Sequence, residues 1–280
     1  MKPDAKPPLV SVIIPTFNRA WILKEAVDSV LAQEFEDFEL IVVDDGSTDA
    51  TAELLDAYAD RVAVLRQTNR GVSAARNAGF AVARGRLIAF LDSDDIWLSG
   101  KLSTQVSFFQ THPDALIHQT EELWVKNGRR VNPGKRHHKR SGMIFEHSLD
   151  LCLVSPSAVM IRRELLDRVG GFDENLPACE DYDLWLRVSC RYPVHLIRTP
   201  LIIKRGGHAD QLSSAWGLDR FRIAAILKMI HENRLTLAQR RAAVATLKQK
   251  CRVYGDGCRK RGRKAEAEYY EKLALEISDE

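Results

Sequence analysis

LIAFLDSDD, residues 87–95, joins an apolar run typical of a buried strand to the acidic cluster that ends it. In an extended chain residues i and i+2 point to the same side, so we expect Asp92 and Asp94 to face one pocket while Asp95 turns away. Two carboxylates held so close repel each other unless a cation or protons neutralise them. Mg²⁺ or Mn²⁺ binds one or two carboxylates and completes its oxygen shell with substrate phosphates, so the pair predicts a metal site that takes a diphosphate. Ser93 and its neighbours also suit a helix N-cap, which is the alternative.

Three earlier apolar runs have the same character as the strand in this stretch. They are Leu9–Ile14, Phe38–Val43 and Arg61–Leu65, and helical periodicity between them predicts successive βαβ units and a parallel sheet. Polar residues end two of these runs, as Pro15-Thr16-Phe17-Asn18 and Asp44-Asp45-Gly46-Ser47. Because ligands of such sheets bind beyond the carboxyl ends of the strands, we expect these ends to share one site.

The remaining sequence alternates less regularly. It predicts a helix over Leu98–His112, an exposed basic loop over Lys126–Arg140, a strand at Ala158–Ile161, and helices over Glu164–Val169 and Glu180–Tyr192. From Trp216 onward the pattern is helical, with breaks expected at Gly255/Gly257 and Gly262, as in an antiparallel pair. We therefore expect a catalytic domain over residues 1–215 and a helical appendage over residues 216–280.

Composition fits a folded soluble protein, with 45% apolar and 28% charged residues in a chain of 280. A net charge of +3 and five cysteines without a CxxC pair give no sign of nucleic-acid binding, a disulfide framework or a structural zinc site. The start MKPDAKPP lacks the apolar core of a signal peptide, and no run is long enough to span a bilayer, so we expect a cytoplasmic protein. Residues 228–264 hold twelve Lys/Arg against two acids, which suits either a solvated helix face or a peripheral contact with the inner membrane surface.

Five segments in fixed order carry a family resemblance. VSVIIPTFNR, FELIVVDDGSTD, NRGVSAARNAG, AFLDSDD and CEDYDLWLR lie between residue 10 and about residue 213. Together they resemble a family 2 glycosyltransferase of the glycosyltransferase A fold. The resemblance implies an α/β fold with a mostly parallel central sheet flanked by helices, followed here by the helical appendage.

The resemblance also implies roles for individual residues. It places the donor, a nucleotide diphosphate sugar and preferably a UDP-sugar, against Pro15, Thr16, Asn18, Asp44, Asp45, Arg76, Asp92 and Ser93. Asp94 would bind Mn²⁺ or Mg²⁺, and His208 in a glycine-hinged loop over residues 205–213 would be a second ligand. Lys204 or Arg205 would steady the departing diphosphate. The alternatives are a turn and helix cap at Thr48 or Asp49, and for Arg76 an ion pair with an acidic neighbour on the surface.

The segment Glu180-Asp181 adds a second group of carboxylates. Asp181 shares a helix face with Leu184, Trp185 and Val188, so it is expected to point inward. The family resemblance gives Asp181 the role of the base that deprotonates the acceptor hydroxyl, and Glu180 a contact with the acceptor. The alternative is that these acids only complement the dipole of the helix N-terminus.

The implied reaction is an inverting transfer of a single sugar to a hydroxyl of a glycan or a lipid-linked acceptor, in the synthesis of a surface polysaccharide or glycoconjugate. Single transfer is favoured because the Gln-x-x-Arg-Trp element of polymerising members does not occur. Two alternatives remain: a non-catalytic nucleotide-sugar or glycan binding module of the same fold, and a nucleotidyltransferase, although PTFNRAW stands where that class carries a glycine-rich basic loop.

Overall fold

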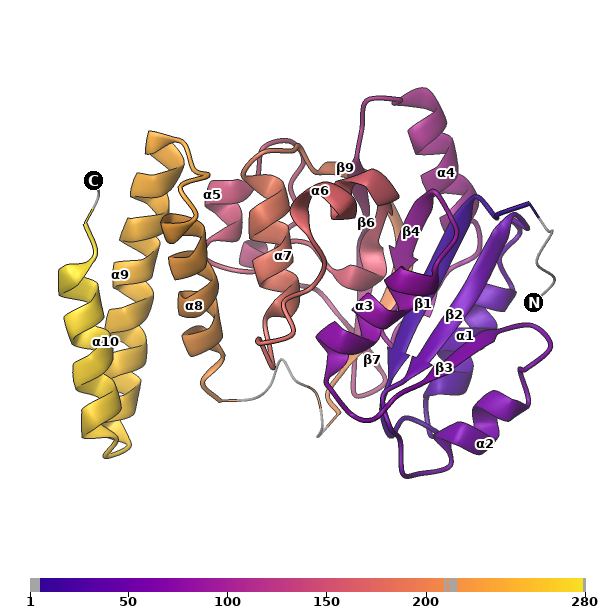
Figure 1. Cartoon of the computed structure of the whole chain (residues 1–280), viewed down its shortest axis with the longest axis horizontal. Coiled ribbons are helices and arrows are strands. Elements are labelled where there is room, and N and C mark those ends of the chain that lie inside the picture. The colour runs from indigo at the N-terminus through magenta and orange to yellow at the C-terminus, as the bar shows by residue number, and fades with distance from the viewer. Residues whose placement is uncertain (1–5, 209–210, 212–215, 279–280) are drawn as a thin grey trace.

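The computed structural model describes residues 6–208, 211 and 216–278, and it shows a central sheet covered on both faces by helices (Figure 1). The strands are β1 Val10–Thr16, β2 Phe38–Asp44, β3 Ala63–Arg66, β4 Leu87–Phe90, β5 Ile96–Trp97, β6 Ile117–Lys126, β7 Arg129–Val131, β8 Val159–Arg162 and β9 His195–Gly206. The helices are α1 Leu23–Leu31, α2 Thr51–Asp56, α3 Val72–Val82, α4 Lys101–Thr111, α5 Phe145–Ser148, α6 Arg163–Val169, α7 Glu180–Ser189, α8 Leu218–His231, α9 Leu237–Lys260 and α10 Lys264–Glu276, with 3₁₀ turns at Lys135–His137 and Pro156–Ala158.

The first half of the sheet is parallel, as predicted. Strands β3, β2, β1 and β4 lie side by side in that order, and Thr16 at the end of β1 pairs in register with Asp44 at the end of β2. Every residue of β1 is buried, which explains why its sequence, VSVIIPT, is mostly apolar and does not alternate with charged residues. Gly79 lets α3 lie directly on the sheet, because a Cβ atom there would stand 2.5 Å from the Ile13 Cγ2 methyl.

In the second half of the sheet, β8 confirms the strand predicted at Ala158–Ile161, whereas β6, β7 and β9 were not predicted. Strands β8, β6, β9 and β5 continue the sheet with antiparallel pairs at β4–β8, β6–β8 and β5–β9 and a parallel pair at β6–β9. The expected exposed loop Lys126–Arg140 contains β7, which pairs back onto β6 as a hairpin. It also contains Lys139, whose side chain is only 6% exposed because it pairs with Glu122.

Three apolar clusters hold these layers together. One lies between the sheet and helices α1 and α4, and a second lies on the opposite face, beneath α3, α6 and α7. The third joins the other side of α7 to α5 and to the C-terminal helices, through Tyr182, Leu186, Ile226, Leu247 and Cys251. Since burial of apolar area drives folding, the C-terminal helices are stabilised largely by the outer side of α7.

The C-terminal region has three helices where the sequence predicts an antiparallel pair. Helix α9 runs without a break through Gly255 and Gly257, which corrects the prediction of a break there, and the chain reverses near Gly262 before α10. Gly255 is buried where α10 comes close, and a Cβ atom at this position would lie 3.5 Å from the Ala267 carbonyl oxygen. The predicted division between residues 215 and 216 lies next to residues 212–215, and these, like residues 1–5, are outside the described residues.

Candidate active site

The polar ends of β1 and β2 form one rigid wall at the carboxyl edge of the sheet. The Asp45 N–H donates to the Thr16 carbonyl oxygen at 2.9 Å, and the Asn18 N–H donates to Ser47 Oγ at 2.9 Å. Asn18 in turn accepts the Thr48 N–H on its side-chain oxygen at 2.7 Å. Asn18 adopts a left-handed backbone with φ of 52°, which asparagine tolerates better than most residues. The two loops therefore move as one unit.

The carboxylates of Asp44 and Asp45 have different surroundings. Asp45 accepts hydrogen bonds from Gln67 Nε2 at 2.7 Å, from the Arg70 N–H at 2.9 Å and from the Gly71 N–H at 2.8 Å, so it anchors the entry to α3. Asp44 accepts the Ser47 N–H on one oxygen at 3.0 Å. The contact of both acids with the donor's base remains a prediction, and Asp44 has the freer carboxylate for it.

The wall formed by the ends of β1 and β2, called the donor wall below, also carries a hydroxyl group. Thr16 Oγ1 is buried and has no hydrogen-bond partner among the described residues, and Pro15 precedes it at the end of β1. The prediction of Thr48 or Asp49 as N-cap is wrong, because α2 is capped at Ala50 without a side-chain bond, although the Asp49 carboxylate accepts the N–H of Thr51 at 3.0 Å. A buried hydroxyl without a partner is costly unless a ligand or water completes it, so Thr16 is well placed to contact a nucleoside.

Asp92, Ser93, Asp94 and Asp95 turn sharply after β4, and the Asp95 N–H donates to the Asp92 carbonyl oxygen at 3.0 Å. Asp95 points into the protein, where it accepts Ser157 Oγ–H at 2.7 Å and the Arg205 N–H at 2.9 Å. Burial, together with the charges of Asp92 and Asp94, raises the pKa of Asp95 well above its ordinary value. Asp95 thus has a structural role, tying β9 to this turn, while Ser93 is buried beside it.

Asp94 faces the other side of the turn. Burial and the negative charge of Asp92 raise the pKa of Asp94, whereas the charges of Arg19 and His208 oppose that rise. The Asp94 carboxylate thus interacts electrostatically with Asp92, as expected if the two share one side of the chain, and also with His208. A bound cation would relieve the repulsion between the carboxylates.

Arg76 connects this acidic turn to α7. Its guanidinium donates to Asp92 Oδ1 at 2.7 Å and to Glu180 Oε1 at 2.6 Å, and its side chain is 4% exposed. Burial alone would lower the pKa of Arg76, but Asp92 and Glu180 together raise it. The guanidinium also lies over the Phe172 ring, 5.0 Å from the centroid. Arg76 does pair with acids, but in the interior of the site and not on the surface.

Lys204 supplies the second connection between the two groups of acids. Burial alone would lower the pKa of Lys204. The negative charges of nearby acids have the larger effect and raise it; these acids are Glu122, Asp95, Asp92 and Asp181. One ammonium group therefore lies within electrostatic reach both of the acidic turn after β4 and of Asp181 on α7. The acids of the turn after β4 and those of α7 are therefore linked through the same two cations, Arg76 and Lys204.

Asp181 lies in the first turn of α7 and is half-buried. Its Oδ1 accepts the N–H of the neighbouring Tyr182 at 2.7 Å, and its Oδ2 lies 3.5 Å from the Cys152 thiol. Burial and the charge of Asp181 raise the pKa of that thiol well above its ordinary value, so Cys152 stays protonated and can donate. Asp181 is ordered by neighbours and still open on one side, as a base that meets an acceptor requires.

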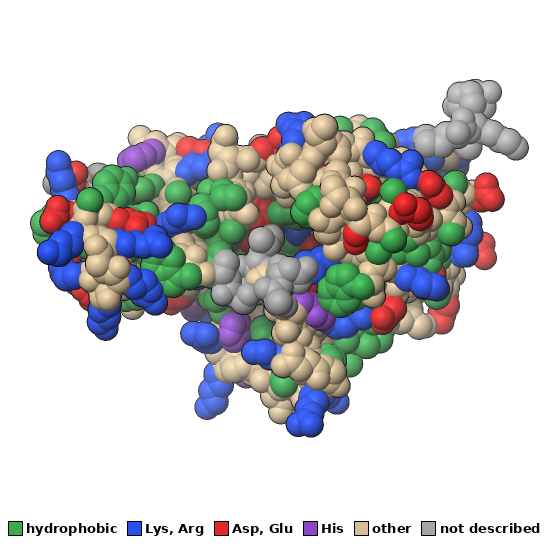
Figure 2. Space-filling view, turned by 90° about the horizontal axis from the view of Figure 1, so that it is seen from below, with side chains coloured by type: hydrophobic (Ala, Val, Ile, Leu, Met, Phe, Trp, Pro, Cys, Tyr) green, Lys and Arg blue, Asp and Glu red, His purple; other side chains and the backbone are tan. Residues whose placement is uncertain are grey.

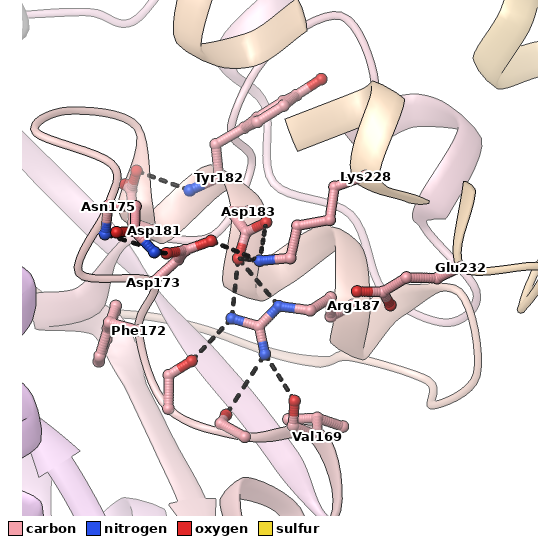
Figure 3. Close-up of polar contacts among 12 residues, drawn as sticks. Val169, Phe172, Asp173, Asn175, Asp181, Tyr182, Asp183, Arg187, Lys228 and Glu232 are labelled. Carbon is pink, nitrogen blue, oxygen red and sulfur yellow. Dashed lines mark hydrogen bonds and ion pairs between the residues drawn. The ribbon is translucent and has the colours of Figure 1, made fainter. Parts of the chain in front are cut away.

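A buried ion network fixes the helix that carries Asp181 (Figure 3). Asp183 is completely buried, with the Arg187 guanidinium 2.8 Å and the Lys228 ammonium 3.0 Å from its carboxylate. Arg187 also donates to the carbonyl oxygens of Val169 at 2.6 Å and Gly171 at 2.7 Å. The network joins α7 to α8 and to the loop after α6. Its only signal in the sequence is the i, i+4 spacing of Asp183 and Arg187.

Backbone strain is also present at the start of α7. Cys179, the residue before Glu180, has φ of 61°, and a non-glycine residue other than Asn or Asp rarely adopts this left-handed conformation. Glu180 follows at once and is buried, and burial raises its pKa although Arg76 opposes the rise. Strain of this kind persists where the surrounding contacts fix the backbone, as they do here. The contact of Glu180 with an acceptor remains a prediction.

His208 and Arg205 come from the end of β9 and the segment after it. The His208 ring packs edge-on against Trp21 with 5.0 Å between centroids, and its Nε2 is buried without a hydrogen-bond partner in the described part of the chain. The Arg205 guanidinium bonds Glu25 at 2.8 Å and the Asp94 carbonyl oxygen, and Nη2 is buried without such a partner. Of the predicted loop, residues 209, 210, 212 and 213 lie outside the described residues.

The side chains near Asp94 supply only some of the ligands that a hard divalent cation needs. Within the described residues no three His, Cys, Asp or Glu side chains gather closely enough to hold a metal ion by themselves. Asp94 and the Nε2 of His208, which has no hydrogen-bond partner among the described residues, would provide two ligands, and Mg²⁺ and Mn²⁺ commonly take the remainder from substrate phosphates and water. The residues present therefore suit a metal that binds together with a diphosphate.

Comparison with known proteins agrees with this geometry. The family model described as "Glycosyl transferase family 2" matches residues 11–170. An uncharacterized glycosyltransferase of Rickettsia prowazekii is 33% identical over 222 residues, covering 76% of this chain and 69% of that protein. A UDP-Glc:α-D-GlcNAc-diphosphoundecaprenol β-1,3-glucosyltransferase of Escherichia coli is 32% identical over 187 residues, covering 64% of this chain and 70% of that protein.

Solved structures show the same fold at lower identity. Staphylococcus aureus TarS 1–349 in complex with UDP-GlcNAc has a TM-score of 0.65 and 20% identity, covering 94% of this chain and 90% of that one. A mannosyltransferase of Pyrobaculum calidifontis in complex with GDP-Man and Mn²⁺ has a TM-score of 0.64 and 18% identity, covering 98% and 76%. The predicted glycosyltransferase A fold is confirmed, and the chain belongs to glycosyl transferase family 2.

Proposed function

We propose that the protein transfers one sugar from a UDP-sugar, with inversion, to a hydroxyl of a glycan carried by a membrane lipid. The observation that carries the proposal is the convergence at Arg76 and Lys204, because both cations interact with the acidic turn after β4 and with acids of α7. The donor class is supported by the Escherichia coli relative, named for UDP-Glc, and the acceptor class by the diphosphoundecaprenol in the same name.

The donor would lie along the wall formed by the ends of β1, β2 and β4. Thr16 Oγ1 and the carboxylate of Asp44 would bind the nucleoside, with Pro15, Asn18 and Asp45 holding the wall in shape. Asp92 and Ser93 would face the ribose or the sugar. The hydrogen bond from the Arg76 guanidinium would hold the Asp92 carboxylate in place. A prearranged wall of this kind saves the entropy of ordering the loops when the donor binds.

The diphosphate would bind between Asp94 and the segment after β9. Asp94 and His208 would hold Mn²⁺ or Mg²⁺, whose positive charge would stabilise the leaving nucleoside diphosphate. Arg205 Nη2 would add positive charge there from β9, since the other two guanidinium nitrogens already bond Glu25 and the Asp94 carbonyl oxygen. Charge stabilisation of the leaving group is the largest contribution expected of such a site.

The acceptor would enter on the open side of Asp181. Its hydroxyl gives a proton to the Asp181 carboxylate as the oxygen attacks the anomeric carbon, and the bond from that carbon to the diphosphate oxygen breaks. Asp181, which must be a carboxylate to accept the proton, is one of the acids whose charge raises the pKa of Lys204. Attack opposite the leaving group inverts the anomeric centre in a single displacement, without a covalent sugar–enzyme intermediate.

A screen of nucleotide sugars tests the proposal. Release of nucleoside diphosphate would be measured with Mn²⁺ or Mg²⁺, with and without a synthetic polyprenyl diphosphate sugar as acceptor. We expect acceptor-dependent release from a UDP-sugar, lost in Asp94→Asn and in His208→Ala. Tight binding of a UDP-sugar without release under any condition would instead indicate a non-catalytic binding module and contradict the proposal.

A further inference from the structure

Residues 126–140 form a strongly basic hairpin that the proposed reaction does not use. The segment contains seven Lys/Arg and no Asp or Glu. The Lys139 side chain is buried, 3.0 Å from Glu122 Oε1 and 2.8 Å from Gln119 Oε1, and so fixes the base of the hairpin to β6. The other six cations are exposed: Lys126, Arg129, Arg130, Lys135, Arg136 and Arg140. The hairpin, defined by residues 126–140, is thus a rigid basic projection.

The turn between α9 and α10 is a second basic group. Residues 259–264 contain five exposed cations and no acid: Arg259, Lys260, Arg261, Arg263 and Lys264. The ring of Trp216 is 43% exposed beneath two of them, with the Arg263 guanidinium 4.3 Å and the Arg261 guanidinium 5.0 Å from its centroid. Only Arg259 and Arg263 of this turn form ion pairs among the described residues, with Glu271 and Glu266.

Both basic groups lie at the edge of the molecule that holds the candidate active site. In Figure 1 the β7 hairpin, the α9–α10 turn and the start of α7, where Asp181 stands, all lie along the lower edge. Figure 2 looks onto that edge and shows Lys and Arg side chains at the end formed by the C-terminal helices and on a second projection across the face. The two groups therefore flank the site on one face.

This face is positive on a body that is otherwise negative. The two segments carry seven and five cations without an acid, whereas the whole chain has a net charge of only +3. A molecule with its positive charge concentrated on one face is oriented by an extended anionic surface, with the site turned towards that surface.

We propose that this face, built from residues 126–140 and 259–264 with Trp216, docks on a bilayer that contains anionic lipid. A bilayer is favoured over a soluble polyanion because apolar groups accompany the charges: Trp216 in one patch and, beside Arg140 in the other, Met143, which is 56% exposed. Tryptophan prefers the interface between lipid and water, and Lys/Arg near it attract anionic headgroups. No described helix is long and apolar enough to cross a bilayer, so the contact is peripheral. The inference deepens the proposed function and rests on its lipid-linked acceptor.

Flotation of the full chain with vesicles tests the docking face. Vesicles of phosphatidylcholine alone would be compared with vesicles containing about 30% phosphatidylglycerol, over a range of salt concentrations. We expect binding only to the anionic vesicles, and weakening as salt rises. R129Q/R130Q and K260Q/K264Q should each weaken binding about 30-fold, since loss of one cation near anionic lipid weakens binding about fivefold.

R86Q/R191Q is the matched control, because it removes two exposed cations just before β4 and just after α7, at the ends of those elements remote from the site. It should bind vesicles as the wild type does, and all three variants should keep transfer to a water-soluble acceptor analogue. No binding to anionic vesicles at low salt, equal loss in the control, or equally tight binding of heparin would overturn the docking proposal. Vesicle binding without any sugar transfer would contradict the proposed function and leave the docking face intact.

Discussion

Replacing Arg76 by Met tests the connection between the donor wall and α7. The substitution keeps most of the side-chain volume and removes the guanidinium that lies 2.7 Å from Asp92 and 2.6 Å from Glu180. Glu180 then stays in the interior, at 8% side-chain exposure, without its described partner. Asp92, at 28%, can reach water more easily. Glu180 should therefore account for most of the loss of stability.

The expected loss is about 3–5 kcal/mol, which is typical for removal of one partner of a buried ion pair. Against a total unfolding free energy on the order of 5–15 kcal/mol, this is a large fraction. In a chain of this size it corresponds to a fall in Tm of about 10 °C.

The loss should also depend on pH, with a definite sign. Burial already raises the pKa of Glu180, and Arg76 opposes that rise, so without Arg76 the folded-state pKa moves further above its unfolded value. The folded variant then binds more protons than the unfolded chain, and its stability falls as pH rises. The difference between wild type and R76M should be smaller near pH 5 than near pH 8.

Thermal and urea unfolding at both pH values would measure these differences. R76M/E180Q should recover part of the loss because it removes the unpaired buried charge. Arg70→Met is the matched control, since Arg70 also pairs with a glutamate, Glu174, at 2.7 Å, but with side chains 60% and 39% exposed. It should cost less than about 1 kcal/mol. An R76M variant no less stable than R70M, or one whose deficit does not change with pH, would refute the reasoning.

Three further substitutions have definite expected results. Asp183→Asn should lower the unfolding free energy by about 2–4 kcal/mol in a urea titration, because the buried guanidinium of Arg187, whose side chain is 7% exposed, loses its carboxylate partner. Burial would raise the pKa of Glu122, but Lys139 and Lys204 lower it to about 2. The contribution of the ionised Glu122 carboxylate to the free energy of unfolding is thus present above about pH 4.5 and should be lost as pH falls to about 2. The difference in this free energy between wild type and E122Q should therefore shrink over that range. Cys152→Ala should lower kcat because it removes the thiol that contacts the Asp181 carboxylate at 3.5 Å, whereas Cys152→Ser, which keeps a donor there, should not.

The parallel half of the fold was predictable because its signals are local. Mostly apolar runs such as Val10–Ile14 mark strands covered on both faces, and the polar residues that follow them mark the ligand edge. The second half was not predictable in the same way. Strand β6 buries His118, Gln119 and Thr120, whose polar side chains look like surface residues until their neighbours in space are known.

The residues of the candidate site divide in the same way, into those with a local signal in the sequence and those without one. Asp92, Asp94 and Asp181 stand out in the sequence because each belongs to a short acidic motif at the start of a turn or helix. Cys152, Lys204 and the network of Asp183 with Lys228 matter through contacts between residues far apart in the chain, such as the 3.2 Å bond from Lys228 to Asp183. No single-sequence pattern encodes contacts of that kind.

The most direct test of the shared site is a comparison of binding and transfer in Asp181→Asn. The amide is nearly the same size as the carboxylate but cannot accept the acceptor's proton, so acceptor-dependent transfer should fall by roughly 10²–10⁴-fold. Affinity for the UDP-sugar with Mn²⁺, measured by calorimetry on the same preparation, should change less than about threefold, because Asp94 and the donor wall are untouched. Full transfer by Asp181→Asn would contradict the account.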